Sequence, residues 1–153
     1  MTFLASFILM VHMLGQTAVA PADNDTVFSP EEKTKIQNTT SANDRIKIYQ
    51  KASVRIQKDL QQSVAKEEFE AVPGTLKRWV SLLSLSYDDL EANLKITKKS
   101  RNLISYEIHV REAIADMRSY KLKAPVSQQD AFDNCIAQAE DIRRKIAEIL
   151  FNL

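Results

Sequence analysis

The sequence predicts an all-α protein, an antiparallel up-down helical bundle. The 153-residue chain contains only two glycines and four prolines, whereas β-sandwiches, barrels and α/β folds need many turn glycines. Its composition, 44% hydrophobic and 27% charged residues, is typical of a chain that folds. Apolar residues then recur at alternate spacings of three and four, which is the pattern of amphipathic helices that share one core.

The N-terminal segment, residues 1–22, contains no charged side chain and predicts a signal peptide. Residues 3–14 form an apolar run as long as a signal-peptide core, and small residues follow it. Cleavage after Ala22 is preferred over cleavage after Ala20, which would leave Pro21 at the first mature position. We therefore expect an exported protein, periplasmic or secreted. Because no Lys or Arg precedes the apolar run, an uncleaved N-terminal membrane anchor is the alternative.

Residues 23–40 are predicted to form a flexible leader and a short N-terminal helix. Ser29-Pro30-Glu31-Glu32 indicates a helix start, since Ser can cap, Pro suits the first position and Glu completes a capping box. The bundle domain is expected over residues 41–153. Its first helix is expected from about Ala42 to Glu70, ended by Pro73-Gly74.

Each later helix has its own expected boundary signal and apolar stripe. Thr75 is expected to cap the second bundle helix and Ser127 the last one. The expected core positions are Ile46, Tyr49, Ser53, Ile56, Leu60, Ser63 and Val64 in the first helix; Leu76, Trp79, Val80, Leu82, Leu83, Leu85, Tyr87, Leu90 and Leu94 in the second; Leu103, Tyr106, Val110, Ala113, Met117 and Tyr120 in the third; and Phe132, Cys135, Ala139, Ile142, Ile146, Ile149 and Leu153 in the fourth.

The apolar pattern lapses over residues 96–102 and resumes in a different phase. A turn at this point gives four bundle helices, which is the version we predict. A continuous helix gives three helices, with one long central helix spanning about 75–121. No Gly or Pro enforces the turn, so the alternative stays open.

The inventory of reactive side chains argues against an enzyme. Beyond residue 22 the chain has one histidine, His109, and one cysteine, Cys135, so a disulfide or a Cys/His zinc site within one chain is excluded. The motifs of di-iron bundles, c-type haem attachment and phosphate-binding loops are missing. A net charge of +1 does not suit a nucleic-acid-binding protein. We expect no catalytic residue, metal or cofactor, and Cys135 in the core.

His109 is the sharpest candidate for a polar site, although a weak one. Glu112 and Asp116 follow it at three and seven residues, so all three could share a helix face. A nearby carboxylate would raise the pKa of the imidazole and give a pH-responsive group, or one chain's contribution to a metal site between subunits. The plainer interpretation is a solvent-facing histidine among ordinary helix charge pairs.

Lys95, Lys98, Lys99 and Arg101 concentrate positive charge at one end of the expected bundle. Such a cluster is a possible contact for an anionic partner, for example a lipid headgroup or a polyanion. The alternative is a solvated junction between helices.

Together these observations predict an exported, non-enzymatic helical-bundle protein. It is expected to act as a binding or scaffold module for an unidentified protein partner, through a helix face or the basic end. A homo-oligomeric structural envelope protein, assembled through exposed parts of the Leu82/Leu85 stripe, is the alternative. An enzyme or a pH-responsive site around His109 is the least favoured hypothesis.

Overall fold

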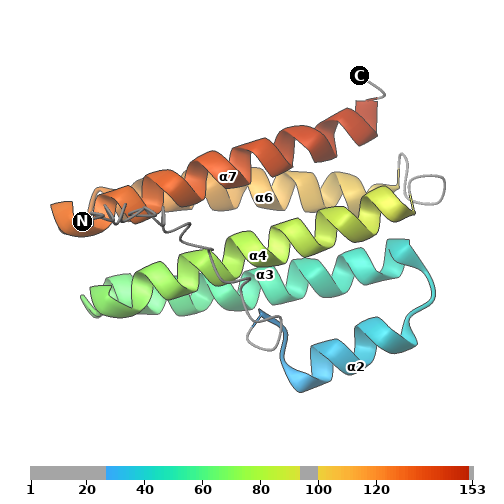
Figure 1. The fold of residues 1–153 in the computed structure, drawn as a ribbon, viewed down its shortest axis with the longest axis horizontal. Helices are drawn as coiled ribbons and strands as arrows, with labels where there is room; N and C mark the ends of the chain where they lie inside the picture. Colours follow the sequence, from blue (N-terminus) through green and yellow to red (C-terminus); the bar gives the residue numbers. More distant parts are fainter. Residues whose placement is uncertain (1–26, 94–99, 152–153) are drawn as a thin grey trace, which may run out of the picture.

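The computed structural model describes residues 27–93 and 100–151, and this part of the chain is all-α without a strand (Figure 1). The predicted signal peptide, Leu94 and Leu153 lie outside the described residues. The helical elements are α2 (Pro30–Asn38), α3 (Ala42–Ala65), the 3₁₀ helix η1 (Phe69–Ala71), α4 (Val72–Ala92), α6 (Arg101–Lys121) and α7 (Val126–Phe151). The predicted helical bundle is confirmed.

α4 and α6 are separate helices, so the version with one long central helix over 75–121 is wrong. α4 ends where the backbone N–H of Asn93 bonds to the carbonyl of Leu90 (3.1 Å). α6 begins after Ser100, whose hydroxyl accepts the backbone N–H of Leu103 (3.0 Å). This N-cap satisfies one of the N–H donors that a helix start leaves without a partner. Because α4 and α6 are separate, the predicted version with four bundle helices is the one that the structure has.

Consecutive bundle helices run in opposite directions. Arg45, near the start of α3, pairs with Asp89 near the end of α4 (2.8 Å). Further along α3, Asp59 pairs with Arg78 in the first half of α4 (3.0 Å). α6 and α7 are related in the same way, because the end of α6 lies against the start of α7 (Figure 1). The molecule is therefore built from two antiparallel hairpins, α3–α4 and α6–α7.

The two hairpins pack so that α3 lies on α6 and α4 lies on α7 (Figure 1). Gln50 of α3 is next to Ser105 of α6, and Gln57 is next to His109. Residue numbers increase together along these pairs, so α3 and α6 are parallel neighbours. α4 and α6, although consecutive in the bundle, stand at diagonal corners. The long outer face of α3 and α6 is thus made by two helices that point the same way.

Most residues of the predicted apolar stripes are buried in the core, but on α4 and α7 the buried positions differ slightly from those predicted. On α4, Ser86 is buried whereas Val80 and Tyr87 are half-buried. On α7, Leu150 replaces Ile149 as the buried residue. The reason is that a strict alternation of three and four averages 3.5 residues per turn, while a straight helix has 3.6. Leu150 lies eighteen residues after Phe132, which is five full turns.

The α2 helix confirms the predicted capping box. The Ser29 hydroxyl accepts the backbone N–H of Glu32 (3.2 Å), and the Glu32 carboxylate accepts the backbone N–H of Ser29 (2.8 Å). The same carboxylate pairs with Arg55 of α3 (2.7 Å), which also donates to the carbonyl of Val27 (2.9 Å). α2 is therefore held along the outside of the bundle by an ion pair that also caps it.

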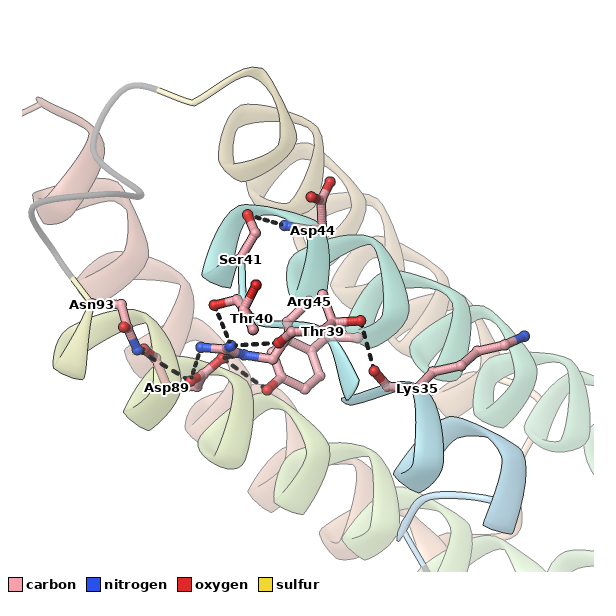
Figure 2. Close-up of polar contacts among 9 residues, drawn as sticks. Lys35, Thr39, Thr40, Ser41, Asp44, Arg45, Asp89 and Asn93 are labelled. Atoms are coloured by element: carbon pink, nitrogen blue, oxygen red, sulfur yellow. Dashed lines mark hydrogen bonds and ion pairs between the residues drawn. The ribbon is translucent and has the colours of Figure 1, made fainter. Parts of the chain in front are cut away.

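A second ion-pair cluster joins the start of α3 to the end of α4 (Figure 2). Asp89 accepts two hydrogen bonds from the Arg45 guanidinium, both at 2.8 Å, and one from the Tyr49 hydroxyl (2.9 Å). Arg45 also donates to the carbonyls of Thr39 and Thr40. A bidentate arginine–carboxylate pair fixes orientation as well as distance, so this cluster sets the register of the α3–α4 hairpin.

The first bundle helix ends earlier than predicted, at Ala65 rather than Glu70. Glu67 adopts the left-handed conformation (φ 60°), its N–H bonds to the carbonyl of Val64 (3.2 Å), and the N–H of Glu68 bonds to that of Ser63 (2.8 Å). This is the Schellman arrangement, which normally places a glycine at the left-handed position. A glutamate there gives no signal in the sequence.

Pro73 and Gly74 were wrongly assigned as the helix terminator, since both lie in the first turn of α4. Proline is tolerated there because the first N–H groups of a helix have no intrahelical partner. Thr75 is inside the helix rather than its cap, and its hydroxyl donates to the carbonyl of Ala71 (3.1 Å). Ser127 is not a cap either, because α7 begins at Val126.

Placing a glycine at position 67 and an alanine at position 74 should each stabilise the protein. Glu67→Gly removes the strain of a left-handed residue, and Gly74→Ala removes the helix penalty of glycine where a Cβ would meet nothing within 4 Å. We expect each change to raise the free energy of unfolding by about 0.5–1 kcal/mol, measured by urea denaturation. Glu68→Gly, at a residue with φ −82°, is the control and should give no gain. A loss of stability in Glu67→Gly would contradict the Schellman assignment.

Candidate functional site

A polar cluster inside the bundle contains His109, the candidate singled out in the sequence. Ser53 and Gln57 of α3, Trp79 of α4 and His109 of α6 form it. The Ser53 hydroxyl lies 2.7 Å from Trp79 Nε1, 2.9 Å from His109 Nε2 and 3.1 Å from the Gln57 amide nitrogen. Ser53 and Trp79 are fully buried, so these contacts replace hydrogen bonds to water.

The donors in this cluster decide the proton position on His109. Trp79 Nε1–H and the Gln57 amide N–H can only donate, so both give their protons to the Ser53 oxygen. The Ser53 O–H is then left to donate to His109 Nε2. The Gln57 amide also lies 3.2 Å from this nitrogen, which again requires an acceptor. Nε2 of a neutral imidazole therefore carries the lone pair and Nδ1 the proton.

The sequence-based expectation of a raised His109 pKa is wrong. Burial lowers the pKa of His109, and this desolvation outweighs the charges of Glu112 and Asp116, which act in the opposite direction. Both carboxylates are on the exposed side of α6, where solvent weakens their effect. The solvent-facing alternative is also wrong, because His109 is half-buried and bonded to α3.

A serine hydroxyl beside a histidine nitrogen is the arrangement of many nucleophilic enzymes. Here Ser53 has no exposed surface, sits in the middle of α3 and already accepts two N–H groups. A substrate carbonyl therefore has no path to its oxygen. What the geometry does supply is a set of satisfied hydrogen bonds that ties α3, α4 and α6 together at one level.

Removing the Ser53 hydroxyl should destabilise the bundle. Ser53→Ala leaves the Trp79 indole N–H buried without its acceptor, which costs about 1–3 kcal/mol. Thermal or urea unfolding followed by circular dichroism measures the loss. Ser63→Ala, on the same helix at a half-buried position, is the control and should change stability by less than about 0.5 kcal/mol. Equal effects of the two substitutions would show that the buried hydrogen bonds do not matter.

Stability should also depend on pH through His109. Because the folded-state pKa is lowered, the unfolded chain binds the proton more readily. The contribution of neutral His109 to the free energy of unfolding is then fully present above the ordinary histidine pKa of about 6.5. It is lost progressively as the pH falls below that value. Comparing urea unfolding at about pH 7.5 and pH 5, we expect a larger loss in the natural protein than in His109→Gln. Carboxylates with lowered pKa values, such as Glu32, lose their contribution at lower pH. The same loss in both proteins would contradict this assignment.

Of the predicted basic patch, only Arg101 belongs to the described residues. Lys95, Lys98 and Lys99 lie outside them, so the patch as predicted stays a prediction. Arg101 is the first residue of α6 and is exposed. It lies at the same end of the bundle as the start of α3, since Asn102 donates to the carbonyl of Asn43 (2.9 Å).

Along the bundle from this end lies a surface that was not predicted from the sequence, and we call it the α3–α6 face. It combines three exposed aliphatic side chains, Val54 (51% exposed), Ile104 (47%) and Ile108 (36%), with exposed charged side chains of both signs. The two helices meet along it where Gln50 contacts Ser105. Val54 is one turn after Gln50, Ile108 is one turn after Ser105, and Ile104 is one turn before Ile108. The charged residues of this face are Lys47, Lys51 and Lys58 on α3 and Arg101, Glu112 and Asp116 on α6.

The α3 side of this face is hollowed, and the charges of the face nearly balance. Lys47, Gln50, Lys51 and Val54 line a surface hollow of about 390 Å³. Lys47 pairs with Asp44 (3.0 Å). Within residues 27–93 and 100–151, the three other cations and the carboxylates of Glu112 and Asp116 form no ion pair.

The surface between α6 and α7 is different, because its charges neutralise one another. Arg143 of α7 bonds to Glu107 of α6 (2.9 Å) and to Glu140 (3.1 Å), and Glu140 also pairs with Arg118 (2.7 Å). Neighbouring charges on α7 are paired along the helix as well. This network joins α7 to α6 by ion pairs, and Arg111, one turn after Glu107, lies on the same side of α6.

Cys135 and the Leu82/Leu85 stripe, both considered in the sequence, lie in or against the core. Cys135 is buried as expected, and burial raises the pKa of its thiol to about 12, so it is a core residue rather than a nucleophile. Leu82 is fully buried and Leu85 packs against the core. The stripe proposed as an oligomer interface therefore faces the interior.

Within the described part of the chain, no three histidine, cysteine or carboxylate side chains are grouped so that they could hold a metal ion. Nor is any described helix long and apolar enough to span a bilayer. The chain matches no family model, no curated protein and no solved structure. A function for this chain therefore has to be argued from its own surface.

Proposed function

We propose that this chain is an exported, non-enzymatic binding module whose α3–α6 face docks a protein partner. One observation carries the proposal: exposed aliphatic side chains and exposed charged side chains without ion pairs coincide on the surface of two adjacent parallel helices. An apolar centre inside a polar rim is the usual anatomy of a protein interface. The proposed export rests on the uncharged N-terminal segment with its apolar run and small residues.

The exposed residues of this face are not required by the fold. Val54, Ile104 and Ile108 point away from a core that is already filled by residues such as Ile56 and Tyr106. Lys51, Lys58 and Arg101 form no ion pair with any of the described residues, so they stabilise the fold through none. A side chain that does not support folding is free to serve binding.

Self-assembly through this face is less well supported. A symmetric dimer places the same surface of both copies in contact, which would put the unpaired cations Lys51 and Lys58 of one copy into the same interface as those of the other. Like charges across an interface repel one another. A different protein therefore suits the surface better than a second copy does.

Site-specific photo-crosslinking tests this function. Benzoylphenylalanine is placed at Val54 or at Ile104, and at Leu122 as the control, an apolar residue that is 85% exposed in the turn after α6. After irradiation in cells that produce the chain, we expect covalent adducts with a second protein at Val54 and Ile104 but not at Leu122.

The other outcomes have definite meanings. Adducts of twice the mass of the chain would favour the homo-oligomeric alternative. Equal labelling at all three positions, or no labelling at Val54 and Ile104, would refute docking at the α3–α6 face.

A further inference from the structure

The two hairpins are joined to each other differently from the helices within each hairpin. Ion pairs join the two helices of a hairpin, namely Arg45–Asp89 and Arg78–Asp59 between α3 and α4, and Arg118–Glu140, Lys121–Asp133 and Arg143–Glu107 between α6 and α7. Among the described residues of these four helices, no ion pair crosses from one hairpin to the other. The contact between the hairpins therefore depends on packing and on neutral hydrogen bonds.

The hydrogen bonds between α3 and α6 include one group that titrates near neutral pH. Two of these bonds join groups that do not ionise, Gln50 to Ser105 (3.4 Å) and the Asn102 amide to the carbonyl of Asn43 (2.9 Å). Further along the same contact, the Ser53 hydroxyl donates to His109 Nε2 (2.9 Å). Histidine changes its charge between about pH 5 and pH 8. The bond to His109 is therefore the point at which pH acts on the contact between α3 and α6.

The partners of His109 on α3 suit its neutral form. Ser53 already accepts the N–H groups of Trp79 and Gln57, which occupy both lone pairs of its oxygen. The Gln57 nitrogen, 3.2 Å from Nε2, is a donor as well. A protonated Nε2 would thus point its N–H at groups that do not accept it. Protonation therefore removes the bond that joins His109 to α3.

The charges that favour protonated His109 lie on its own helix. Lys58 of α3 and Arg78 of α4, next to the cluster along the chain, are cations and do not stabilise a second one. α7 packs on the opposite side of α6, so its charges do not face the imidazole. The carboxylates that act on His109 are Glu112 and Asp116 of α6, both exposed. Because residues three apart are neighbours on a helix surface, an imidazolium that leaves Ser53 can reach Glu112.

We propose that His109 is a pH-sensitive latch between the two hairpins. When it is neutral, it accepts the Ser53 hydroxyl and holds α6 against α3. When it is protonated, it leaves Ser53 for the carboxylates of Glu112 and Asp116, and α3 and α6 part at this level while both hairpins stay folded. The latch does not depend on the binding function proposed above. It also differs from a loss of overall stability at low pH, because the helices persist.

The direction of the response follows from the two surroundings of the imidazole. In the closed arrangement, burial lowers the pKa of His109. Beside exposed carboxylates the pKa returns to its ordinary value of about 6.5 or rises above it. The closed arrangement is therefore favoured above about pH 6.5. Below it, the opening equilibrium increases by up to about tenfold per pH unit until the lowered pKa is passed.

Trp79 reports the latch, because it is the only tryptophan of the chain and is fully buried against Ser53. Acrylamide quenching of its fluorescence is measured on the full chain at about pH 7.5 and pH 5, together with circular dichroism. We expect several-fold stronger quenching and a red-shifted emission at the lower pH, with unchanged helical content. In His109→Gln, whose amide oxygen accepts from Ser53 but does not titrate, quenching should stay low. His12 is present in both proteins.

Gln57→Glu should keep the latch closed at low pH. Its carboxylate would stand where the Gln57 amide lies 3.2 Å from His109 Nε2, so the protonated imidazole gains an acceptor on α3. Quenching of Trp79 should then stay low at both pH values. Gln62→Glu adds the same charge at an exposed position on another side of α3 and should respond as the natural protein does.

A tether between helices locates the movement. Gln50→Cys with Ser105→Cys, joined by a short thiol-specific linker, ties α3 to α6 and should abolish the response of Trp79 to acid. Arg118→Cys with Glu140→Cys, joined in the same way, ties the two helices of one hairpin and should preserve it. The natural Cys135 is buried, and the pKa of its thiol is raised to about 12, so it does not compete for the linker.

Five results would overturn the latch. Quenching could stay low in the natural protein at the lower pH, or rise only together with a loss of helix. His109→Gln could show the same rise as the natural protein, or Gln57→Glu could respond like Gln62→Glu. Finally, the response could persist when α3 is tied to α6, which would place the movement elsewhere than between the hairpins.

Discussion

The indole N–H of Trp79 imposes the requirement around which the bundle is arranged. Trp79 is among the largest fully buried side chains, and its N–H would cost free energy if it were buried without an acceptor. Ser53 supplies that acceptor, and the Ser53 hydroxyl then needs His109 as its own acceptor. Three helices are thereby aligned at one level. Apolar packing alone would permit them to slide or rotate, because it has no direction.

The features that depend on residues close together in the sequence could be predicted from it. The Ser29 capping box, the helix start at Ala42 and the buried positions of α6 are set by spacing along one helix, which the chain shows directly. The end of α3 was mispredicted because a glutamate takes the left-handed position there. The punctuation residues Pro73 and Gly74, by contrast, lie inside a helix. Helix ends depend on hydrogen bonds that residue preference only partly determines.

Both candidate sites depend on contacts between residues far apart in the sequence. Ser53, Trp79 and His109 come from three helices, and no spacing rule links them. One hint was present: Ser53 interrupts an apolar stripe, and a core tryptophan needs an acceptor. The α3–α6 face could not be predicted, since it requires two parallel helices to be neighbours. An up-down bundle with short connections instead favours contact between α4 and α6.

The diagonal arrangement of α4 and α6 also makes the molecule electrically polar across its width. In a bundle whose neighbours all run in opposite directions, adjacent helix dipoles cancel. Here α3 and α6 present their amino ends together, while the carboxyl ends of α4 and α7 lie beside them at the same end of the bundle. One half of that end is therefore electropositive and the other electronegative, so the field around the protein has a preferred direction even at a net charge of +1.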